Sequence, residues 1–577
     1  MTREEASAKR KAGAAGWLAG WNLGRPFDGS TDWRNLTFYT PVIEKAIEPV
    51  FDPQKESCSA IAFGDFNRKS GLSGPLSGSF GNPFRETGYS LWQSLTAHPV
   101  PGEAAAIAAK AASENFSGEA IWAAAFWAAA IAAAPFETSV EACLLRGMSA
   151  IPENSKLQRI PKGLIDAKRA GCDWQLCRER LLEWLKVHPE DAQAAFGFAY
   201  IACLYGDGDF GKSLCIAAGC GGAASAQAAA VGALVAAGVG VIPTEWESPT
   251  LSCALPNQIS TEAQQAFQEE RFTSFFDPPT PAEGEQPLSP DRSFLDDFSA
   301  IRRLHTRRQN ESVVESARLS LAVSYPDGVC APRGTNHSLA LRITNNSNEP
   351  IEVLPSISAS ETVSIAHRAM KVRVEPLAST QLAVIANAAV ESKNPHVQVL
   401  AEDVQLRAPL LQTTSCWIAS PFDNRAQLGY DRAFAPETDL SPTAVYKGRS
   451  DLLVRWCEYQ LCGVELDLEP HFLSAPGVLY LTAELLFDTP DLNAIIASPV
   501  GQIVWVNGEK RSWYHDTHIT WPKPKAPYLT PMKNDGWTRL LIKILRNDQA
   551  LAPTVIYFTT QSGEVVRPIA SRQPLTG

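Results

Sequence analysis

The chain lacks the excess of positive charge that nucleic-acid-binding proteins carry. Its 577 residues include 62 Asp and Glu against 51 Lys and Arg, for a net charge of −11. A phosphate-rich polymer is therefore not expected as a partner. Cysteine is also sparse, with 12 residues and no Cys-x-x-Cys pair of the kind that zinc sites use. We expect reduced and mostly buried thiols.

Long apolar runs are missing as well. The most apolar stretch, at 121–136, reads IWAAAFWAAAIAAAPF and is mostly alanine. It is shorter than the roughly 18 to 20 apolar residues that span a bilayer, and we interpret it as a helix buried among other helices. The first residues, MTREEASAKRKAGAAGWLAGW, lack the apolar core of a secretory signal. These two absences predict a cytoplasmic protein without a membrane partner.

A hydrophobic content of 45% and this length are enough for several packed domains. Long Ala-rich segments predict an all-α domain over 1–275, because alanine favours helix and allows close helix packing. A Pro-rich, polar linker that contains a short helix is expected over 276–311. Short alternating runs of Val, Ile, Leu and Thr then predict two antiparallel β-sandwiches, over 312–420 and 421–577. In the second, Asn507-Gly508 between alternating runs predicts a hairpin.

Five stretches of the N-terminal half resemble the ADP-ribosylglycohydrolase family, an all-α fold, in the family's order. The first, GWLAGWNLGRPFDG at 16–29, is similar to the family's opening helix and catalytic loop. The others are GEAIWAAAFWAAAIAAA at 118–134, IPENSKL at 151–157, LYGDGDFGK at 204–212 and VGALVAAGVGVIPTEW at 231–246. The resemblance implies a hydrolase of glycosidic bonds to ribose that uses two divalent metal ions.

The metal motifs of that family are degenerate in this chain. The family's late motif is Gly-Gly-x-Asp-Thr-Asp, and Ala223 and Ser225 stand at its two Asp positions. Its early acidic motif is expected near 82–95, where NPFRETGYSLWQSL retains Glu86 as the single carboxylate. Magnesium needs hard oxygen ligands, which alanine does not supply. We therefore predict no metal and no cofactor.

One acid of the family's site persists in type. The loop LGRPFD aligns with the family pattern Leu-Gly-Lys-Pro-x-Glu and places Asp28 where the family has a Glu. Asp28 is thus either a catalytic acid that is one methylene shorter or an ordinary loop or N-cap Asp.

Other acidic residues also have both a functional and a structural interpretation. Asp65 lies in a Gly-rich loop and is a candidate for ligand binding, whereas Asp207 and Asp209 are expected as turn and N-cap residues. Glu119 is expected as a first-turn acid.

The C-terminal part resembles the galactose-binding-like modules of carbohydrate-active enzymes. The resemblance rests on VWVNGE at 504–509 and GWTRLLIKI at 536–544, which are chiefly structural elements. Between them, Trp513, Tyr514 and Trp521 offer aromatic faces that suit sugar C–H groups. The alternative is a long loop that packs its own aromatic side chains.

Three functions follow from these patterns. The first is a glycosidase-type hydrolase on the ADP-ribosylglycohydrolase fold that works without metal, with Asp28 and Glu86 as its two carboxylates. The second is a pseudoenzyme that binds a sugar, an ADP-ribosyl ligand or a protein partner without turnover. The third is a scaffold whose β-domains mediate assembly. The first two imply a carbohydrate or ribosyl-containing small molecule as the ligand, and the sequence leaves the oligomeric state open.

Overall fold

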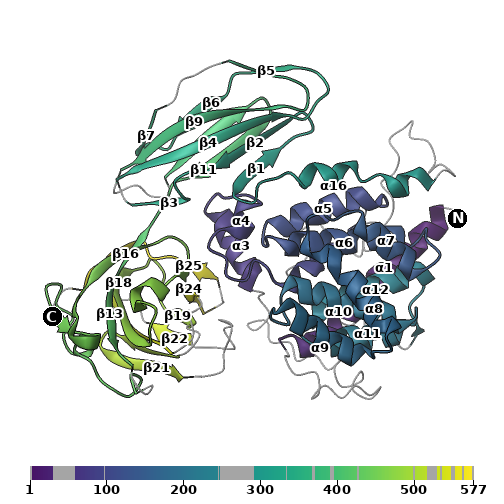
Figure 1. The fold of residues 1–577 in the computed structure, drawn as a ribbon. Coiled ribbons are helices and arrows are strands. Elements are labelled where there is room, and N and C mark those ends of the chain that lie inside the picture. Colours follow the sequence, from purple (N-terminus) through teal and green to yellow (C-terminus); the bar gives the residue numbers. More distant parts are fainter. Residues whose placement is uncertain are drawn as a thin grey trace. The chain divides into compact units, whose positions relative to one another are not determined.

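A computed structural model provides the three-dimensional structure of the chain. It describes residues 3–29, 59–96, 98–244, 246, 292–332, 334–366, 371–389, 395–424, 428–497, 501–515, 529–532, 536–547, 553–561 and 564–574. The chain divides into two compact units. The helical unit contains residues 1–64, 74–79 and 84–309, and the β-rich unit contains 65–73, 80–83 and 310–577. The predicted order, an all-helical domain followed by a region of antiparallel sheets, is confirmed (Figure 1).

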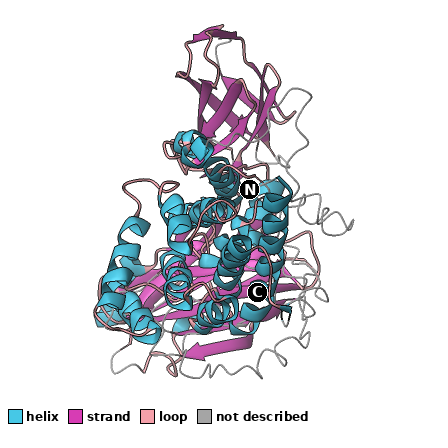
Figure 2. Ribbon diagram, turned by 90° about the vertical axis from the view of Figure 1, so that its right-hand side faces the viewer, coloured by secondary structure: helices cyan, strands magenta, loops and turns pink. Residues whose placement is uncertain are grey.

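The helical unit is built from α-helices and short 3-10 turns, and no β-sheet is formed in its described part. Figure 2 draws the helices of the chain in cyan and its strands in magenta. In chain order the elements are α1 (Arg3–Gly24), η1 (Arg25–Phe27), α3 (Ser59–Lys69), α4 (Leu76–Ser79), η3 (Gly88–Ser94), α5 (Pro101–Ser113), α6 (Glu119–Ala133), α7 (Val140–Met148), η4 (Lys156–Arg159), α8 (Ile160–Arg169), α9 (Trp174–Leu185), α10 (Ala192–Gly206), α11 (Phe210–Gly219), α12 (Ala224–Val239), η5 (Arg292–Asp296) and α16 (Ser299–Leu304). The last residues of α3 belong to the β-rich unit.

Local sequence signals explain where several of these helices begin. Ser139, Asp173 and Asp209 each accept a hydrogen bond from a backbone N–H of the first turn of α7, α9 and α11, which satisfies a donor that the helix leaves unpaired. Pro101 and Pro161 stand at the first positions of α5 and α8, where a missing N–H costs nothing. The predicted N-cap role of Asp209 is therefore confirmed.

The α1 and α12 helices pack backbone against backbone. Gly16, Gly20 and Gly24 form one face of α1, and a Cβ atom at these positions would lie 2.3, 2.0 and 2.4 Å from carbonyl oxygens of α12. Only glycine leaves room for that approach, and alanine on α12 supplies the matching small surface. The close packing fixes the C-terminal end of α1 beside the N-terminal end of α12.

The first part of the β-rich unit consists of small, mostly antiparallel sheets. A five-stranded sheet has the order β1 (Glu311–Glu315), β2 (Leu319–Ser324), β4 (Asn336–Asn345), β9 (Ser379–Ala388) and β7 (Val363–Ala366). A three-stranded sheet contains β11 (Val404–Pro409), β10 (His396–Ala401) and β6 (Ser356–Ala359), and β5 (Ile351–Val353) pairs with β8 (Val372–Val374). A short parallel pair joins β3 (Cys330–Ala331) to β12 (Leu411–Gln412).

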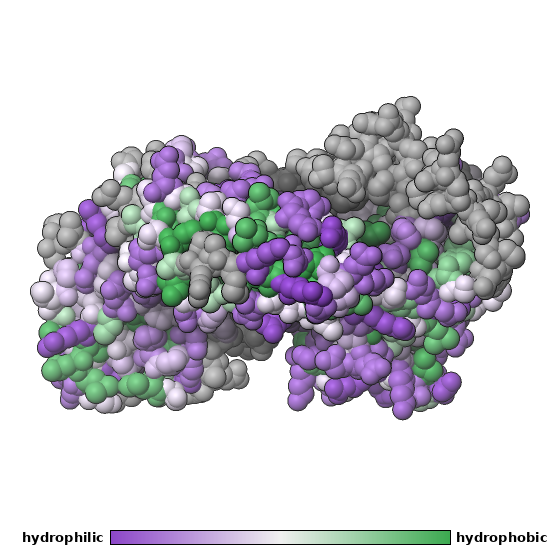
Figure 3. Space-filling model, turned by 90° about the horizontal axis from the view of Figure 1, so that it is seen from above, coloured by the Kyte–Doolittle hydropathy of each residue, from purple (hydrophilic) through white to green (hydrophobic). Residues whose placement is uncertain are grey.

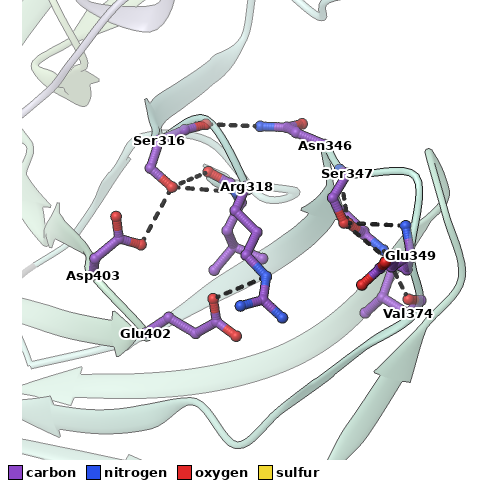
Figure 4. A network of polar contacts seen from close by, with 10 residues as sticks. Ser316, Arg318, Asn346, Ser347, Glu349, Val374, Glu402 and Asp403 are labelled. Atoms are coloured by element: carbon purple, nitrogen blue, oxygen red, sulfur yellow. Dashed lines mark hydrogen bonds and ion pairs between the residues drawn. The ribbon is translucent and has the colours of Figure 1, made fainter.

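Polar contacts tie the turns of these two larger sheets together (Figure 4). The Asn346 side chain donates to the Ser316 carbonyl at 3.1 Å, and the Ser316 hydroxyl donates to Asp403 at 3.2 Å. Arg318 and Glu402 form an ion pair at 3.8 Å. Ser316 and Arg318 lie between β1 and β2, whereas Glu402 and Asp403 lie between β10 and β11. The network is therefore structural and joins one edge of each sheet.

The second part contains two larger sheets that share a core. One has the order β16 (Cys457–Leu461), β13 (Thr414–Asp423), β18 (Gly477–Leu486), β23 (Thr538–Arg546), β20 (Gly501–Val506) and β21 (Glu509–His515), with β26 (Ala570–Arg572) on β18. The other has the order β17 (Glu465–Leu466), β24 (Thr554–Thr560), β19 (Leu492–Ala497) and β22 (Leu529–Met532), with β25 (Val565–Val566) on β24. A small pair, β14 (Val445–Lys447) and β15 (Leu453–Arg455), completes it. Because β13 pairs with β16 and β18, this part begins at Thr414.

Residues on β18 show why its sequence is apolar throughout. Leu479 and Leu481 face the core between the two sheets, while Tyr480 packs on the opposite face against Phe422. A strand that is buried on both faces does not need alternating apolar and polar residues. Asn507 and Gly508 both have positive φ and connect β20 to β21, which confirms the predicted hairpin.

The apolar helices and the exposed apolar side chains of the described residues give no sign of a membrane-spanning helix. No helix in the described ranges is long and apolar enough to cross a bilayer. In the space-filling view of Figure 3, hydrophilic residues are interspersed with smaller hydrophobic areas on the face that is drawn. Trp184, Leu145 and Leu453 are among the large apolar side chains that are exposed. Scattered exposure of this kind is ordinary for a folded protein.

Candidate functional site

Asp28 lies where α1 meets α12. It follows η1 directly, and its backbone N–H donates to the Arg25 carbonyl at 3.1 Å. Its carboxylate Oδ1 accepts a hydrogen bond of 2.9 Å from the backbone N–H of Ser225, in the first turn of α12. The N–H of Gly29 donates to the Gly222 carbonyl at 2.8 Å. The end of α1 thus aims this carboxylate at a helix N-terminus, which favours a negative charge.

Burial dominates the electrostatics of Asp28. Loss of solvent raises the pKa of its carboxyl group from 3.8 to about 7. The hydrogen bond from Ser225 acts in the opposite direction, the negative charge of Glu190 raises the pKa further, and the charge of Arg25 lowers it. A carboxyl group with a pKa near neutrality can both hold and release a proton at physiological pH, which is the property of a general acid.

A second raised carboxyl group is found at the start of α10. Asp191 is the N-cap of this helix and accepts a hydrogen bond of 2.8 Å from the backbone N–H of Gln193. Burial raises its pKa to about 6, the negative charge of Glu86 adds to the effect, and Lys156 opposes it. Glu86 itself is exposed. The charge of Glu190 thus acts on Asp28, and the charge of Glu86 acts on Asp191.

Backbone contacts hold these segments together. The N–H of Gly88 donates to the Glu190 carbonyl at 2.7 Å, and the N–H of Ala192 donates to the Glu86 carbonyl at 2.9 Å. Gly222 has a φ of 70°, and a Cβ atom there would lie 2.2 Å from the Pro189 carbonyl. Only glycine fits this turn, because both the positive φ and the close approach exclude a side chain. The N-terminal ends of η3, α10 and α12 consequently meet around the Asp28 loop.

The two predicted degenerate metal positions are enclosed by protein. Ala223 is the N-cap of α12, and both it and Ser225 are fully buried. The Ser225 hydroxyl is the single side-chain oxygen that these two positions offer, whereas a divalent metal site needs several hard oxygen ligands. Within the described ranges, no three His, Cys, Asp or Glu side chains are grouped closely enough to hold an ion. The residues present here do not fit a binuclear metal centre.

A pocket opens elsewhere on the helical unit, beside the start of α6. It is half open to solvent and encloses only about 30 Å³, and Trp122, Lys110, Arg307 and Gln309 are among its lining residues. The Gln309 side chain accepts a hydrogen bond of 3.0 Å from the N–H of Gly118, the residue before α6. A space of this size is comparable to that of a water molecule and is too small to enclose a sugar or a nucleotide ring. The sequence pattern gave no indication of this pocket, because its residues come from α5, α6 and the segment after α16.

The other acids that the sequence singled out have structural partners. Glu119 accepts hydrogen bonds from the Ser155 hydroxyl at 2.5 Å and from the Lys156 N–H at 3.0 Å, so it joins the start of α6 to η4. Asp207 pairs with Lys212 at 2.8 Å, which lowers the pKa of this exposed carboxyl group. Asp65 is exposed, pairs with Arg68 on α3 and belongs to the β-rich unit.

The aromatic residues expected to contact sugar lie at the edge of what the structure describes. Trp513 and Tyr514 belong to β21, opposite Ile503 and Gln502 of β20, rather than to a loop. Trp521 lies outside the described residues. On α6, Trp127 is a buried core residue that packs edge to face on Phe126.

One comparison with known proteins finds a match within the helical part. Residues 50–271 match the model of the ADP-ribosylglycohydrolase family. Asp28 precedes the matched range, although the helix that carries it packs on α12 within that range. No curated protein sequence shows significant similarity to the chain.

Two solved structures show weak likeness to the chain. An anti-sigma factor domain-containing protein is 7% identical with a TM-score of 0.18, over 43% of this chain and 88% of that one. The GH31 alpha-xylosidase from Xanthomonas citri is 7% identical with a TM-score of 0.13, over 44% of this chain and 29% of that one. At these TM-scores neither likeness supports a statement about fold or function.

Proposed function

We propose that the ADP-ribosylglycohydrolase-family domain matched over 50–271, together with the α1 helix that packs on it, hydrolyses a glycosidic bond without the family's metal pair. The observation that carries the proposal is the state of Asp28, a half-buried carboxyl group that accepts the Ser225 N–H at the start of α12 and whose pKa is raised to about 7. An Asp in a merely structural loop has no need of such an environment, because keeping an acid near neutrality in the interior is costly. The expected substrate is a sugar or ribosyl conjugate.

Asp28 supplies the acid of the proposed reaction. The Ser225 N–H binds Oδ1, so the proton of the neutral form is carried by Oδ2. Transfer of that proton to the oxygen of the leaving group accompanies cleavage of the glycosidic carbon–oxygen bond and generates an oxocarbenium-like sugar. The leaving group departs as a neutral alcohol, and Asp28 becomes ionised. Its hydrogen bond from the start of α12 then stabilises the negative charge.

A second carboxylate is required to stabilise the positive sugar and to accept a proton from the attacking water. Glu190 fits this role because its charge acts directly on Asp28. Its carboxylate also accepts a hydrogen bond of 3.4 Å from the hydroxyl of Tyr89. Glu86, the residue to which the sequence assigned the role, acts on Asp191 instead and is kept as the alternative second carboxylate. The cycle closes when solvent returns a proton to Asp28 and removes one from the second carboxylate.

A catalytically inactive, ligand-binding domain is the second candidate function. The replacement of two metal-binding carboxylates by Ala223 and Ser225 favours it, since the family's chemistry depends on the metal ions. In this second case Asp28 would contact the ligand or orient the start of α12 without proton transfer.

For the remainder of the chain we propose a galactose-binding-like module as the C-terminal part, with a carbohydrate or ribosyl ligand and a cytoplasmic location. Support comes from the Asn507-Gly508 hairpin and from β23, which lies between β18 and β20 in the larger sheet. Two sheets that share one core are consistent with such a module. These features concern the fold and support the ligand only by analogy.

Turnover of a panel of glycosides and ADP-ribosyl compounds tests the proposal. Asp28→Asn keeps the size and the hydrogen-bond acceptor while it removes the titratable group, so hydrolysis should fall by ~10² or more. Comparison of Glu190→Gln with Glu86→Gln identifies the second carboxylate, because only one of the two should reduce the rate to a similar degree. Calorimetry on the same panel distinguishes the alternative: binding without turnover in the parent protein would reject the hydrolase and support the inactive domain.

A further inference from the structure

Two cysteines that lie far apart in the sequence meet in the β-rich unit. Cys330 is a buried residue of β3, and Cys462 is an exposed residue just after β16. Their side chains are hydrogen-bonded to each other. The backbone of Gly463 also contacts the Cys330 thiol, so the two segments are held together by more than one interaction. A disulfide needs its two sulfur atoms side by side, and the contact between the two thiols meets this first requirement.

A cation completes the cluster. The guanidinium of Arg567 lies over the rings of Phe66 and Phe80, at 4.9 and 5.2 Å from their centroids. Its charge acts on both Cys330 and Cys462. All five residues belong to the β-rich unit, to which residues 65–73 and 80–83 contribute the two aromatic rings. An arginine held by two rings beside two thiols favours the thiolate form of whichever sulfur is accessible.

The two thiols are thereby made unequal. The hydrogen bond from Cys330 lowers the pKa of Cys462, and Arg567 lowers it further. The same hydrogen bond and burial raise the pKa of Cys330 well above its ordinary value. The accessible sulfur is therefore the better nucleophile, and the enclosed sulfur keeps its proton.

We propose that Cys330 and Cys462 form a reversible disulfide when the protein meets a peroxide. The Cys462 thiolate attacks one oxygen of the peroxide, the O–O bond breaks, and a sulfenic acid forms with release of water or an alcohol. The Cys330 thiol then attacks the Cys462 sulfur, and the S–S bond forms as the sulfenic hydroxyl leaves as water. Two thiols are oxidised and one peroxide is reduced. A dithiol reductant reverses the reaction by thiol–disulfide exchange.

Two other cysteines of the described ranges, Cys457 and Cys177, differ from Cys462. Cys457 on β16 is exposed and contacts only the Arg455 carbonyl, at 3.8 Å. Cys177 has a Tyr205 hydroxyl at 3.1 Å, and burial raises its pKa. Cys457 is thus a matched control that lies five positions before Cys462, is also exposed and has no thiol partner among the described residues. Cys58 and Cys253 lie outside the described residues.

The test is peptide mapping of the full-length protein after treatment with hydrogen peroxide and alkylation of the remaining thiols. A cross-linked pair of peptides that contain Cys330 and Cys462 is expected, together with a rise in Tm that a dithiol reductant reverses. Cys330→Ser should accumulate a sulfenic acid on Cys462, which a dimedone-type probe traps. Cys462→Ser should leave Cys330 reduced, and Cys457→Ser should behave as the parent. Absence of the cross-link in a protein whose Cys457 has been oxidised would overturn the proposal.

The role of Arg567 has its own readout. Alkylation of Cys462 by iodoacetamide, followed against pH, reports its thiolate fraction. Arg567→Lys should keep the profile near that of the parent, whereas Arg567→Met should reduce the rate near neutral pH by up to about 10-fold for each unit by which the pKa rises. An identical profile in all three proteins would contradict the assigned effect of the arginine. Circular dichroism establishes that each variant is folded before its rate is interpreted.

Discussion

Replacement of Asp28 by asparagine should make the protein more stable while it removes the proposed acid. The side chain is half-buried, and its carboxylate Oδ1 accepts the Ser225 N–H at 2.9 Å. The Asn side chain has the same shape and an oxygen that can accept this hydrogen bond. It has no charge to desolvate and none to repel Glu190. Residues selected for catalysis commonly reduce stability in this way.

The size of the effect follows from the pKa shift. Burial raises the pKa of Asp28 from 3.8 to about 7, and each pKa unit corresponds to about 1.4 kcal/mol. Because the folded-state pKa is the higher one, the folded state binds the proton more tightly than the unfolded state does. Stability is therefore highest at low pH and is lost as pH rises from about 4 through about 7. The penalty at alkaline pH is on the order of 4 kcal/mol, and the Asn variant does not have it.

Urea unfolding at two pH values measures this difference. Asp28→Asn should exceed the parent by a small amount near pH ~4 and by several kcal/mol near pH ~8, since only the parent must ionise its half-buried acid. The matched control is Asp166→Asn on α8, an exposed acid 3.7 Å from Arg169, which should change stability by less than about 0.5 kcal/mol at either pH. A gain that is the same at both pH values, or a loss at the higher one, would refute the reasoning.

Three further predictions concern the metal positions, the glycine packing and the units. Calorimetric titration with Mg²⁺ or Mn²⁺ should show no binding at the start of α12, and heat of binding lost on substitution there would contradict this. Gly20→Ala should destabilise the protein by about 1 to 3 kcal/mol in denaturant unfolding, although alanine favours helix, because the added Cβ meets the α12 backbone. Gly163→Ala on α8, which has open space around it, should stabilise the protein by up to about 1 kcal/mol. Equal effects of the two variants would exclude the close packing of α1 on α12. Proteolysis within 277–290 should give fragments that co-elute on gel filtration, because 65–73 and 80–83 belong to the β-rich unit; separate elution would contradict that assignment.

The architecture was largely predictable because its signals are local and repeated. Alanine-rich stretches and N-cap residues such as Asp209 predicted the helices, and alternation predicted the strands after 310. The inclusion of 65–73 and 80–83 in the β-rich unit was not predictable. Those segments contribute few residues, and their contacts with Arg567 connect positions hundreds of residues apart. Strand β13 follows the strands of the first sheets in sequence but pairs with β16 and β18 of the second part, and the sequence does not indicate these pairing partners.

The sequence indicated single residues of the candidate site, but it did not indicate which acidic residues lie near one another in the fold. The loop pattern indicated Asp28, whereas Glu190 was missed because no motif surrounds it and its proximity depends on how α10 meets the Gly222 turn. The raised pKa of Asp191 was missed for the same reason, since its sequence context resembles an ordinary N-cap. Burial depends on the whole fold, and a single sequence carries little information about it.

The pH dependence of hydrolysis in the presence of excess chelator tests the central claim most directly. If Asp28 is the acid of a metal-independent glycosidase, the parent protein should hydrolyse at least one glycoside or ADP-ribosyl compound with chelator present. Its rate should fall as pH rises through about 7, because the acid must be protonated. The Asp28→Asn variant should be slower by ~10² or more across the same range. Turnover that stops when chelator is added, or a parent profile that is unchanged in the variant, would contradict the account.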